Sequence, residues 1–257
     1  MFSFALVTLT CALALLAVAP VARATPVEVL LREAAAAEQR LDSQAALDLF
    51  LRADQARPGD AFILQKIARQ YSDSIVDLPA GDVAEKKRRA QLALDYALRA
   101  AALEPGNAEN ILSVAVCHGT LAVYSDTRTK IRYSRLVKEE AERALKLSPD
   151  YDWAHHILGR WHYEVATLGP ATRFFVRLIY GGLPEASVQE AVAHLERAVA
   201  LAPQTGPHHL ELGFARLAAG RKDEARAAFT RGLALPSVGK HDEAAKARAR
   251  EALARLN

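Results

Sequence analysis

Ten residues in the middle of the chain, HHILGRWHYE from His155 to Glu164, carry the side chains best suited to chemistry. They include three of the eight histidines, one of the two tryptophans, a tyrosine and a glutamate. Imidazoles and a carboxylate on one helix are the ligand types of a zinc centre. In a zinc protease, however, two histidines lie four residues apart with a glutamate beside the first, whereas His155 and His162 lie seven apart. A metal-dependent enzyme using His155 and His162 is therefore our least favoured hypothesis, and histidines that pack between helices are the preferred interpretation.

The rest of the chain offers no anchor for catalysis. It contains no G-x-S-x-G motif, no glycine-rich phosphate loop and no cluster of paired cysteines. Gly181 and Gly182 are expected to end a helix, and Cys117 to be a small buried helix residue. We predict no enzyme, no cofactor and no metal. The 33 basic and 30 acidic residues are interspersed, which argues against a dedicated nucleic-acid-binding protein.

An apolar run opens the chain and ends in the tripeptide Ala22-Arg23-Ala24. Such a run with an A-x-A sequence is typical of a secretory signal peptide. We therefore expect residues 1–24 to be a signal peptide cleaved after Ala24, and the mature protein, residues 25–257, to be periplasmic or secreted. The alternative is an uncleaved membrane anchor formed by residues 4–22, which would make the protein a membrane-tethered scaffold.

A repeated pattern organises the remainder of the chain. Four segments place a small or apolar residue twelve, eight and five positions before a proline, and a fifth segment ends one place early at Pro236. Each segment predicts an amphipathic helix that a proline terminates. The four sets are Ala46, Phe50, Ala53 and Pro58; Ala93, Ala97, Ala100 and Pro105; Val137, Ala141, Ala144 and Pro149; and Ala191, Leu195, Ala198 and Pro203.

A second pattern follows each proline: a large residue, two unspecified positions, an apolar residue and a small residue. Together the two patterns resemble the tetratricopeptide repeat, a 34-residue helix-turn-helix unit. We predict an all-α fold, a tetratricopeptide-like solenoid of about five helix pairs that forms one domain over residues 25–257. The second pattern occurs as Leu64, Ile67 and Ala68; Ile111, Val114 and Ala115; His155, Leu158 and Gly159; and His209, Leu212 and Gly213.

Most units are longer than the standard repeat, and the extra residues fall between the two helices. In the second and third units they predict elongated hairpins. In the fourth unit they are numerous enough for an inserted helix at about residues 171–180. The alanine-rich segment His241 to Asn257 is expected to be a capping helix, because the last repeat of a stack needs a polar outer face.

Three segments carry a more specific resemblance: LQKIARQYSDS at Leu64, KIRYSRLVKEEAERALKLSPDY at Lys130, and HHILGRWHYEVATLGPATRFFVRLIYGGLPEASVQEAVAHLERAVALAP from His155. Over about residues 60–253 the chain resembles the helical-repeat region of the regulator of microtubule dynamics proteins. The resemblance implies an all-helical body that binds protein without catalysis; eukaryotic members are associated with microtubules and organelle contacts. A cleaved signal would keep this chain away from tubulin. We therefore expect a bacterial, exported relative with another partner, and keep microtubule association as an alternative.

The fourth unit is the best candidate for partner binding. On the first helix of a repeat, positions two, five, nine and twelve face the concave groove of the stack. Aromatic residues and arginine at such positions are typical of binding hot spots. We predict a non-catalytic scaffold or adaptor that binds an unknown, partly apolar peptide or protein through Arg69, Trp153, His156, Arg160, Tyr163, Glu164 and Phe214.

The inserted helix leaves an alternative open. Its sequence FFVRLIY, residues 174–180, is apolar and is expected to be covered by something. If it folds back into the groove, Trp153 and Tyr163 belong to the core. If it stays exposed, it is a patch for a partner or for a membrane surface, with Arg173 and Arg177 four residues apart.

Overall fold

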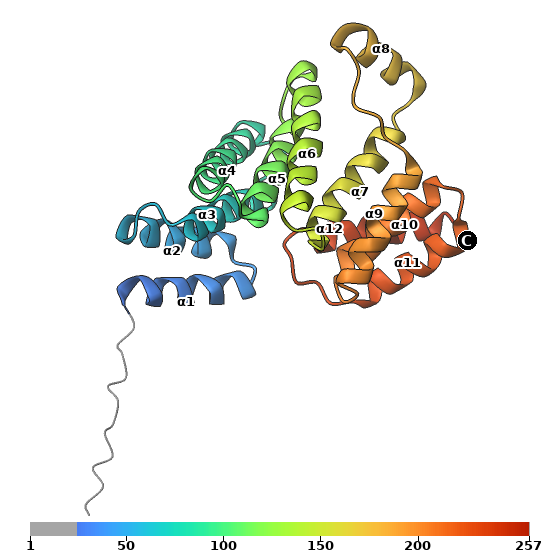
Figure 1. Cartoon of the computed structure of the whole chain (residues 1–257). Coiled ribbons are helices and arrows are strands. Elements are labelled where there is room, and N and C mark those ends of the chain that lie inside the picture. Colours follow the sequence, from blue (N-terminus) through green and yellow to red (C-terminus); the bar gives the residue numbers. More distant parts are fainter. Residues whose placement is uncertain (1–24, 257) are drawn as a thin grey trace, which may run out of the picture.

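The computed structural model describes residues 25–256, and over that range it consists of twelve α-helices and one short 3-10 helix without a strand (Figure 1). Ten helices form five successive hairpins, as predicted. The pairs are α1 (Pro26–Gln39) with α2 (Ser43–Ala56), α3 (Ala61–Asp73) with α4 (Val83–Leu103), α5 (Ala108–Val123) with α6 (Thr127–Leu147), α7 (Asp152–Ala166) with α9 (Val188–Leu201), and α10 (Gly206–Ala218) with α11 (Lys222–Ala234). The inserted helix is α8 (Pro170–Tyr180), and α12 (Asp242–Ala254) follows the last pair.

Local sequence signals determine where the helices begin and end. Thr25 forms a capping box with Glu28 at the start of α1, and six later helices begin with a polar side chain that accepts a backbone N–H. The second helix of every pair ends two residues before a proline, because the residue preceding a proline is disfavoured in the α conformation. Those prolines are Pro58, Pro105, Pro149, Pro203 and Pro236.

Small residues allow the paired helices to approach closely. Alanines at the predicted positions are completely buried, for example Ala53, Ala144 and Ala198. A Cβ atom added to Gly159 of α7 would lie 2.7 Å from Cγ of Leu195 on α9. These positions therefore set the distance between the helices, and the larger apolar side chains fill the space around them.

The extra residues of the second and third units lengthen the hairpins, as predicted. α4 and α6 each contain 21 residues, and a 3-10 turn, η1 (Ser74–Asp77), follows α3. The extra residues of the fourth unit form α8, which agrees with the predicted inserted helix to within one residue. Gly181 ends α8 with a φ of 75°, a left-handed conformation that favours glycine.

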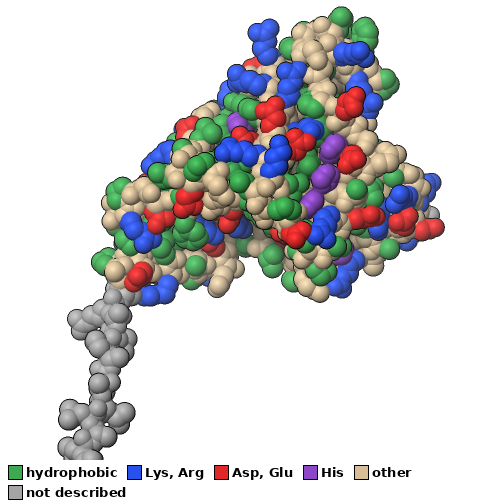
Figure 2. Space-filling view, viewed as in Figure 1, with side chains coloured by type: hydrophobic (Ala, Val, Ile, Leu, Met, Phe, Trp, Pro, Cys, Tyr) green, Lys and Arg blue, Asp and Glu red, His purple; other side chains and the backbone are tan. Residues whose placement is uncertain are grey.

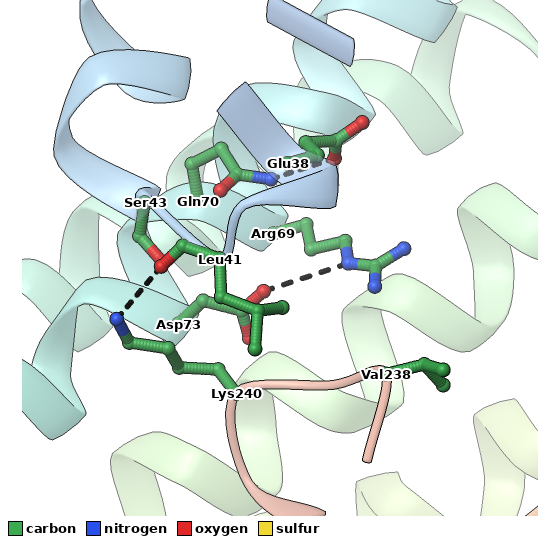
Figure 3. A pocket seen from close by; sticks show the side chains of 8 residues that line it. All are labelled: Glu38, Leu41, Ser43, Arg69, Gln70, Asp73, Val238 and Lys240. Atoms are coloured by element: carbon green, nitrogen blue, oxygen red, sulfur yellow. Dashed lines mark hydrogen bonds and ion pairs between the residues drawn. The ribbon is translucent and has the colours of Figure 1, made fainter. Parts of the chain in front are cut away.

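The C-terminal part of the chain returns across the molecule. α12 packs on α10 and α11, as expected for a capping helix. The segment before it, residues 236–241, which we call the strap, reaches the first two hairpins. Lys240 Nζ lies 2.8 Å from the carbonyl oxygen of Leu41 (Figure 3). It also lies 2.8 Å from Asp77, and His241 lies 3.4 Å from Asp73. The strap thereby ties the last hairpin to the first two.

Two further observations bear on the sequence predictions. Cys117 is a buried residue of α5, and burial raises the pKa of its thiol to about 12. None of the described helices is long and apolar enough to cross a membrane. The predicted signal peptide, residues 1–24, lies outside the described residues.

Candidate partner-binding groove

The first helices of the hairpins line the inner side of the solenoid. α3 packs against α5, and α7 packs against α10, whereas the second helices of the same hairpins do not pack on one another to the same extent. At these two junctions the first helices lie closer together than the second helices do, so the stack curves toward the first helices there, and the faces that they turn away from their own hairpins form the concave groove. The predicted groove residues lie on these helices.

Four of the predicted residues form an accessible stripe along α7. Trp153 is 39% exposed near the start of the helix, and Tyr163 is half-buried two to three turns later. Arg160 and Glu164 are exposed between and beyond the aromatic rings, and their charged groups are 3.7 Å apart. An exposed ion pair of this kind contributes roughly 0–1 kcal/mol to stability. Either side chain can therefore leave the pair and bind a ligand at a low cost in free energy.

His156 lies beneath this stripe and differs from the prediction. Its side chain is only 5% exposed, because its ring packs against Trp153 and His208. Nδ1 of His156 lies 3.0 Å from Nδ1 of His208, and Nε2 of His208 lies 2.9 Å from Asp152. Asp152 accepts from Nε2, so His208 Nδ1 accepts a hydrogen bond from His156 in the neutral pair. His156 therefore supports Trp153 from below and does not line the groove surface.

Burial disfavours the charged forms of His156 and His208. It lowers the pKa of His156 well below its ordinary value, and the neighbouring His208 and Arg160 lower it further. Burial also lowers the pKa of His208, although its hydrogen bond to Asp152 opposes that effect. Both imidazoles are neutral at pH 7, which is the form that the hydrogen bonds between α7 and α10 require.

A second histidine cluster lies on the side of α7 that faces α9, where Figure 2 shows a row of histidines on the surface. Nε2 of His155 lies 3.0 Å from the carbonyl oxygen of Pro149, and its Nδ1 lies 2.9 Å from Nδ1 of His194. His162 is buried and stacks on His194. Both nitrogens of His155 thus have partners within the protein. Among residues 25–256, no group of three or more His, Cys, Asp or Glu side chains is arranged to hold a metal ion.

The other two predicted residues, Arg69 and Phe214, lie in different surroundings. Arg69 of α3 pairs with Asp73 at 3.5 Å in a small pocket that the strap closes with Val238 and Lys240 (Figure 3). Phe214 of α10 is half-buried and lies beneath the guanidinium of Arg248, which is 4.6 Å from its ring centre. The structure therefore brings Phe214 next to Tyr163, with ring centres 6.3 Å apart, but places Arg69 in a separate site.

The inserted helix does not cover the stripe. α8 packs on α6 and projects away from the body of the molecule (Figure 1). Its large apolar side chains remain exposed, so they do not bury Trp153 or Tyr163. α12 does reach the end of the stripe, because its Arg248 lies over the ring of Phe214.

Sequence reasoning missed three residues of this region: His208, Asp152 and Arg248. His208 gave no signal of its own, since the repeat pattern marks its neighbour His209, which, like His155, follows a proline by six residues and contacts that proline's carbonyl oxygen. Arg248 had no signal, because its position in an alanine-rich capping helix did not indicate which face of α10 it would reach. It contacts both Phe214 and the buried Glu211.

Comparison with known proteins assigns the chain to a family. The family model described as "Regulator of microtubule dynamics protein 1-3" matches residues 30–257. Regulator of microtubule dynamics protein 2 of Homo sapiens is 28% identical over 133 residues, and protein 3 of Xenopus laevis is 34% identical over 89 residues. These matches cover 51% and 35% of this chain but only 32% and 19% of those relatives, so the chain matches less than half of their length.

A solved structure supports the fold independently. The crystal structure of TTC0263, a thermophilic TPR protein of Thermus thermophilus, superposes with a TM-score of 0.64 and 21% identity. The match covers 89% of this chain and 99% of that one. The helix hairpins described above are therefore tetratricopeptide-like, and the chain belongs to the regulator of microtubule dynamics protein 1-3 family.

Proposed function

We propose that the protein is a non-catalytic scaffold that binds a partly apolar peptide or protein segment along α7. The observation that carries this proposal is the accessible stripe of Trp153, Arg160 and Tyr163, which α8 leaves uncovered. Ten residues of helix separate the two aromatic rings, which corresponds to about 15 Å at a rise of about 1.5 Å per residue. An extended peptide covers that distance with about five residues.

The chemistry of the stripe defines the peptide that fits it. The two aromatic rings offer apolar contacts with little loss of side-chain freedom. Arg160 supplies a planar donor that can bind a carboxylate through two hydrogen bonds once its weak pairing with Glu164 is given up. We therefore expect a ligand with an acidic side chain or a carboxyl terminus flanked by aromatic or aliphatic residues.

Selection from a displayed peptide library tests this proposal. Peptides enriched on the wild-type protein should lose about tenfold or more in affinity for Arg160→Glu and Tyr163→Ala, as expected for residues of a binding hot spot. Arg197→Glu is the matched control, because Arg197 is as exposed as Arg160, 48% against 47%, and also pairs with an acidic residue, Asp150. Circular dichroism should show unchanged helicity for all three variants.

Two results would refute the proposal that the peptide binds along α7. If Arg197→Glu weakens the selected peptides as much as Arg160→Glu does, the binding is electrostatic and not located on α7. If Tyr163→Ala unfolds the protein, Tyr163 belongs to the core and the stripe loses one of its two rings.

Microtubule association is a second candidate, because the relatives are named as regulators of microtubule dynamics. Co-sedimentation with polymerised tubulin at physiological ionic strength tests it. Saturable binding that Arg160→Glu reduces would identify tubulin as the partner of the groove. Binding that is lost at moderate salt would reflect only the basic character of the chain.

We also propose that the protein is exported and cleaved after Ala24. In support, the capping box that starts the first helix uses Thr25, whose backbone nitrogen lies 2.7 Å from Glu28, so cleavage at this point would keep every contact of α1 described here. N-terminal sequencing of the protein from the cell envelope should give Thr25 as the first residue. A retained apolar segment would favour the membrane-tethered alternative.

A further inference from the structure

α8 leaves most of its apolar surface in water. Val176 is its only buried side chain, whereas four other large apolar side chains of this helix are 57% to 68% exposed. Successive residues of a helix are about 100° apart, so these four span an arc of about 140°, and Val176 lies outside this arc, about 60° beyond Ile179. A contiguous apolar face of this kind is a contact surface. The four residues, which we call the apolar face of α8, are Phe174, Phe175, Leu178 and Ile179.

The surroundings of this face are basic. α8 contains Arg173 and Arg177 and no acidic residue. The first turns of α6, on which α8 packs, add four basic residues, and the only acidic residues in segments 124–137 and 168–186 are Asp126 and Glu185. None of the six basic residues lies within ion-pair distance of a carboxylate in the described part of the chain. They are Arg128, Lys130, Arg132, Arg135, Arg173 and Arg177.

The shape of this region suits a flat binding surface. α8 projects from the molecule, and Figure 2 shows Lys and Arg side chains around the same projection. Arg135 of α6 fixes the end of the helix by donating to the carbonyl oxygen of Tyr180 at 2.7 Å. A helix of 11 residues is about half as long as a membrane span, which needs about 20. It is long enough to lie in the plane of a bilayer surface.

We propose that α8 docks the protein on an anionic phospholipid surface. The apolar face of α8 enters the boundary between head groups and acyl chains, while Arg173, Arg177 and the basic turns of α6 contact lipid phosphates. Pairing of two copies through the same face is disfavoured, because it would bring the two basic clusters together without acidic partners. Binding of a peptide in a groove is also disfavoured here, because α8 projects from the body of the molecule and its four large apolar side chains are each more than half exposed (Figure 1).

Hydrogen–deuterium exchange of the full chain with and without vesicles tests the proposal at α8 itself. Vesicles of one part phosphatidylglycerol to three parts phosphatidylcholine should slow the exchange of residues 170–182 about tenfold, and pure phosphatidylcholine vesicles much less. Leu178→Glu should abolish this protection. Val83→Glu is the matched control, because Val83 is also more than half exposed but lies at the start of α4, and it should leave the protection unchanged.

The readout is confined to α8, so attachment of the chain to vesicles through another segment does not imitate it. Exchange of residues 170–182 that is the same with and without anionic vesicles would overturn the proposal. Protection that appears without vesicles as the protein concentration rises would also overturn it, and would assign the face to a second copy of the chain. Peptide binding along α7 is expected to be unaffected by Leu178→Glu. A negative result for membrane docking therefore leaves the proposed peptide site on α7 untouched, and a negative result for that site leaves membrane docking untouched.

Discussion

The imidazoles of α7 act through hydrogen bonds and packing. His155 occupies the position that a large aromatic residue holds in the repeat pattern, and it bridges Pro149 and His194. His209 occupies the same position in the next unit and contacts Pro203 in the same way. An imidazole here fills the space between two helices and also satisfies the carbonyl group that the proline turn exposes. The spacing of His155 and His162 differs from that of a zinc protease motif, but it gave no information about His194 or His208, which approach from other helices.

Buried histidines should make the protein sensitive to mild acid. Burial lowers the pKa of His118 and of His194 to about 4, and lowers the pKa values of His156, His162 and His208 as well. In the unfolded chain each imidazole binds a proton near pH 6.5. The unfolded state therefore binds more protons between about pH 6.5 and 4, and the free energy of unfolding should fall as the pH decreases through that window.

The variant His118→Gln isolates one of these groups. Its side chain cannot be protonated, so the variant should lose less stability than the wild type between pH 6.5 and 4, by up to about 3 kcal/mol for a shift of this size. Urea unfolding monitored by circular dichroism at several pH values measures the difference. Identical pH dependence in the two proteins would show that folding does not lower the pKa of His118.

At the scale of the elements, the hairpins were predictable because local signals and the repeat agree. Every second helix ends two residues before the proline that the sequence pattern identified, and α8 forms where the longest insertion lies. The direction of α8 could not be predicted. Its apolar residues would suit either the groove or an exposed surface, and the observed hydrogen bond at its end comes from Arg135, which lies 45 residues before Tyr180 in the sequence.

The close approach of paired helices gives a prediction with an internal control. Gly159→Ala would place a Cβ atom 2.7 Å from Leu195 and 3.1 Å from the backbone oxygen of Ala191, so it should cost about 1–3 kcal/mol. Gly119→Ala on α5 meets only Val137 at 3.8 Å and should stabilise the protein by up to about 1 kcal/mol, because alanine favours the helix. Chemical denaturation measures both. Equal effects would contradict the packing described for α7 and α9.

At the scale of the whole molecule, the strap links the two ends of the solenoid. Lys240 contacts Leu41, 199 residues earlier, and Asp77. Leu41 itself has a φ of 57°, a left-handed conformation that is unusual for a leucine and that directs its carbonyl group to Lys240. The capping role of α12 could be predicted from its sequence. The contact of the strap with the first two hairpins could not, because residues so far apart in the chain show no common local pattern.

Reversing the charge at this contact should open the molecule. Lys240→Glu would place a carboxylate beside Asp77 and the Leu41 carbonyl, and we expect a loss of about 1–3 kcal/mol and release of the strap. Small-angle X-ray scattering should then give a larger radius of gyration. Lys222→Glu, at an exposed position in the first turn of α11, should change neither quantity. An unchanged radius in Lys240→Glu would mean that other contacts hold the ends together.

The groove on α7 is the central claim, and the two tryptophans of the chain allow a direct test. Trp153 is exposed in the groove, whereas Trp161 is buried and donates to the Ser134 carbonyl oxygen at 2.8 Å. Acrylamide quenching of tryptophan fluorescence therefore reports mainly on Trp153. A saturating amount of a selected peptide should reduce the quenching to the low level expected of Trp161 alone. Unchanged quenching while calorimetry records binding of the same peptide would contradict the claim.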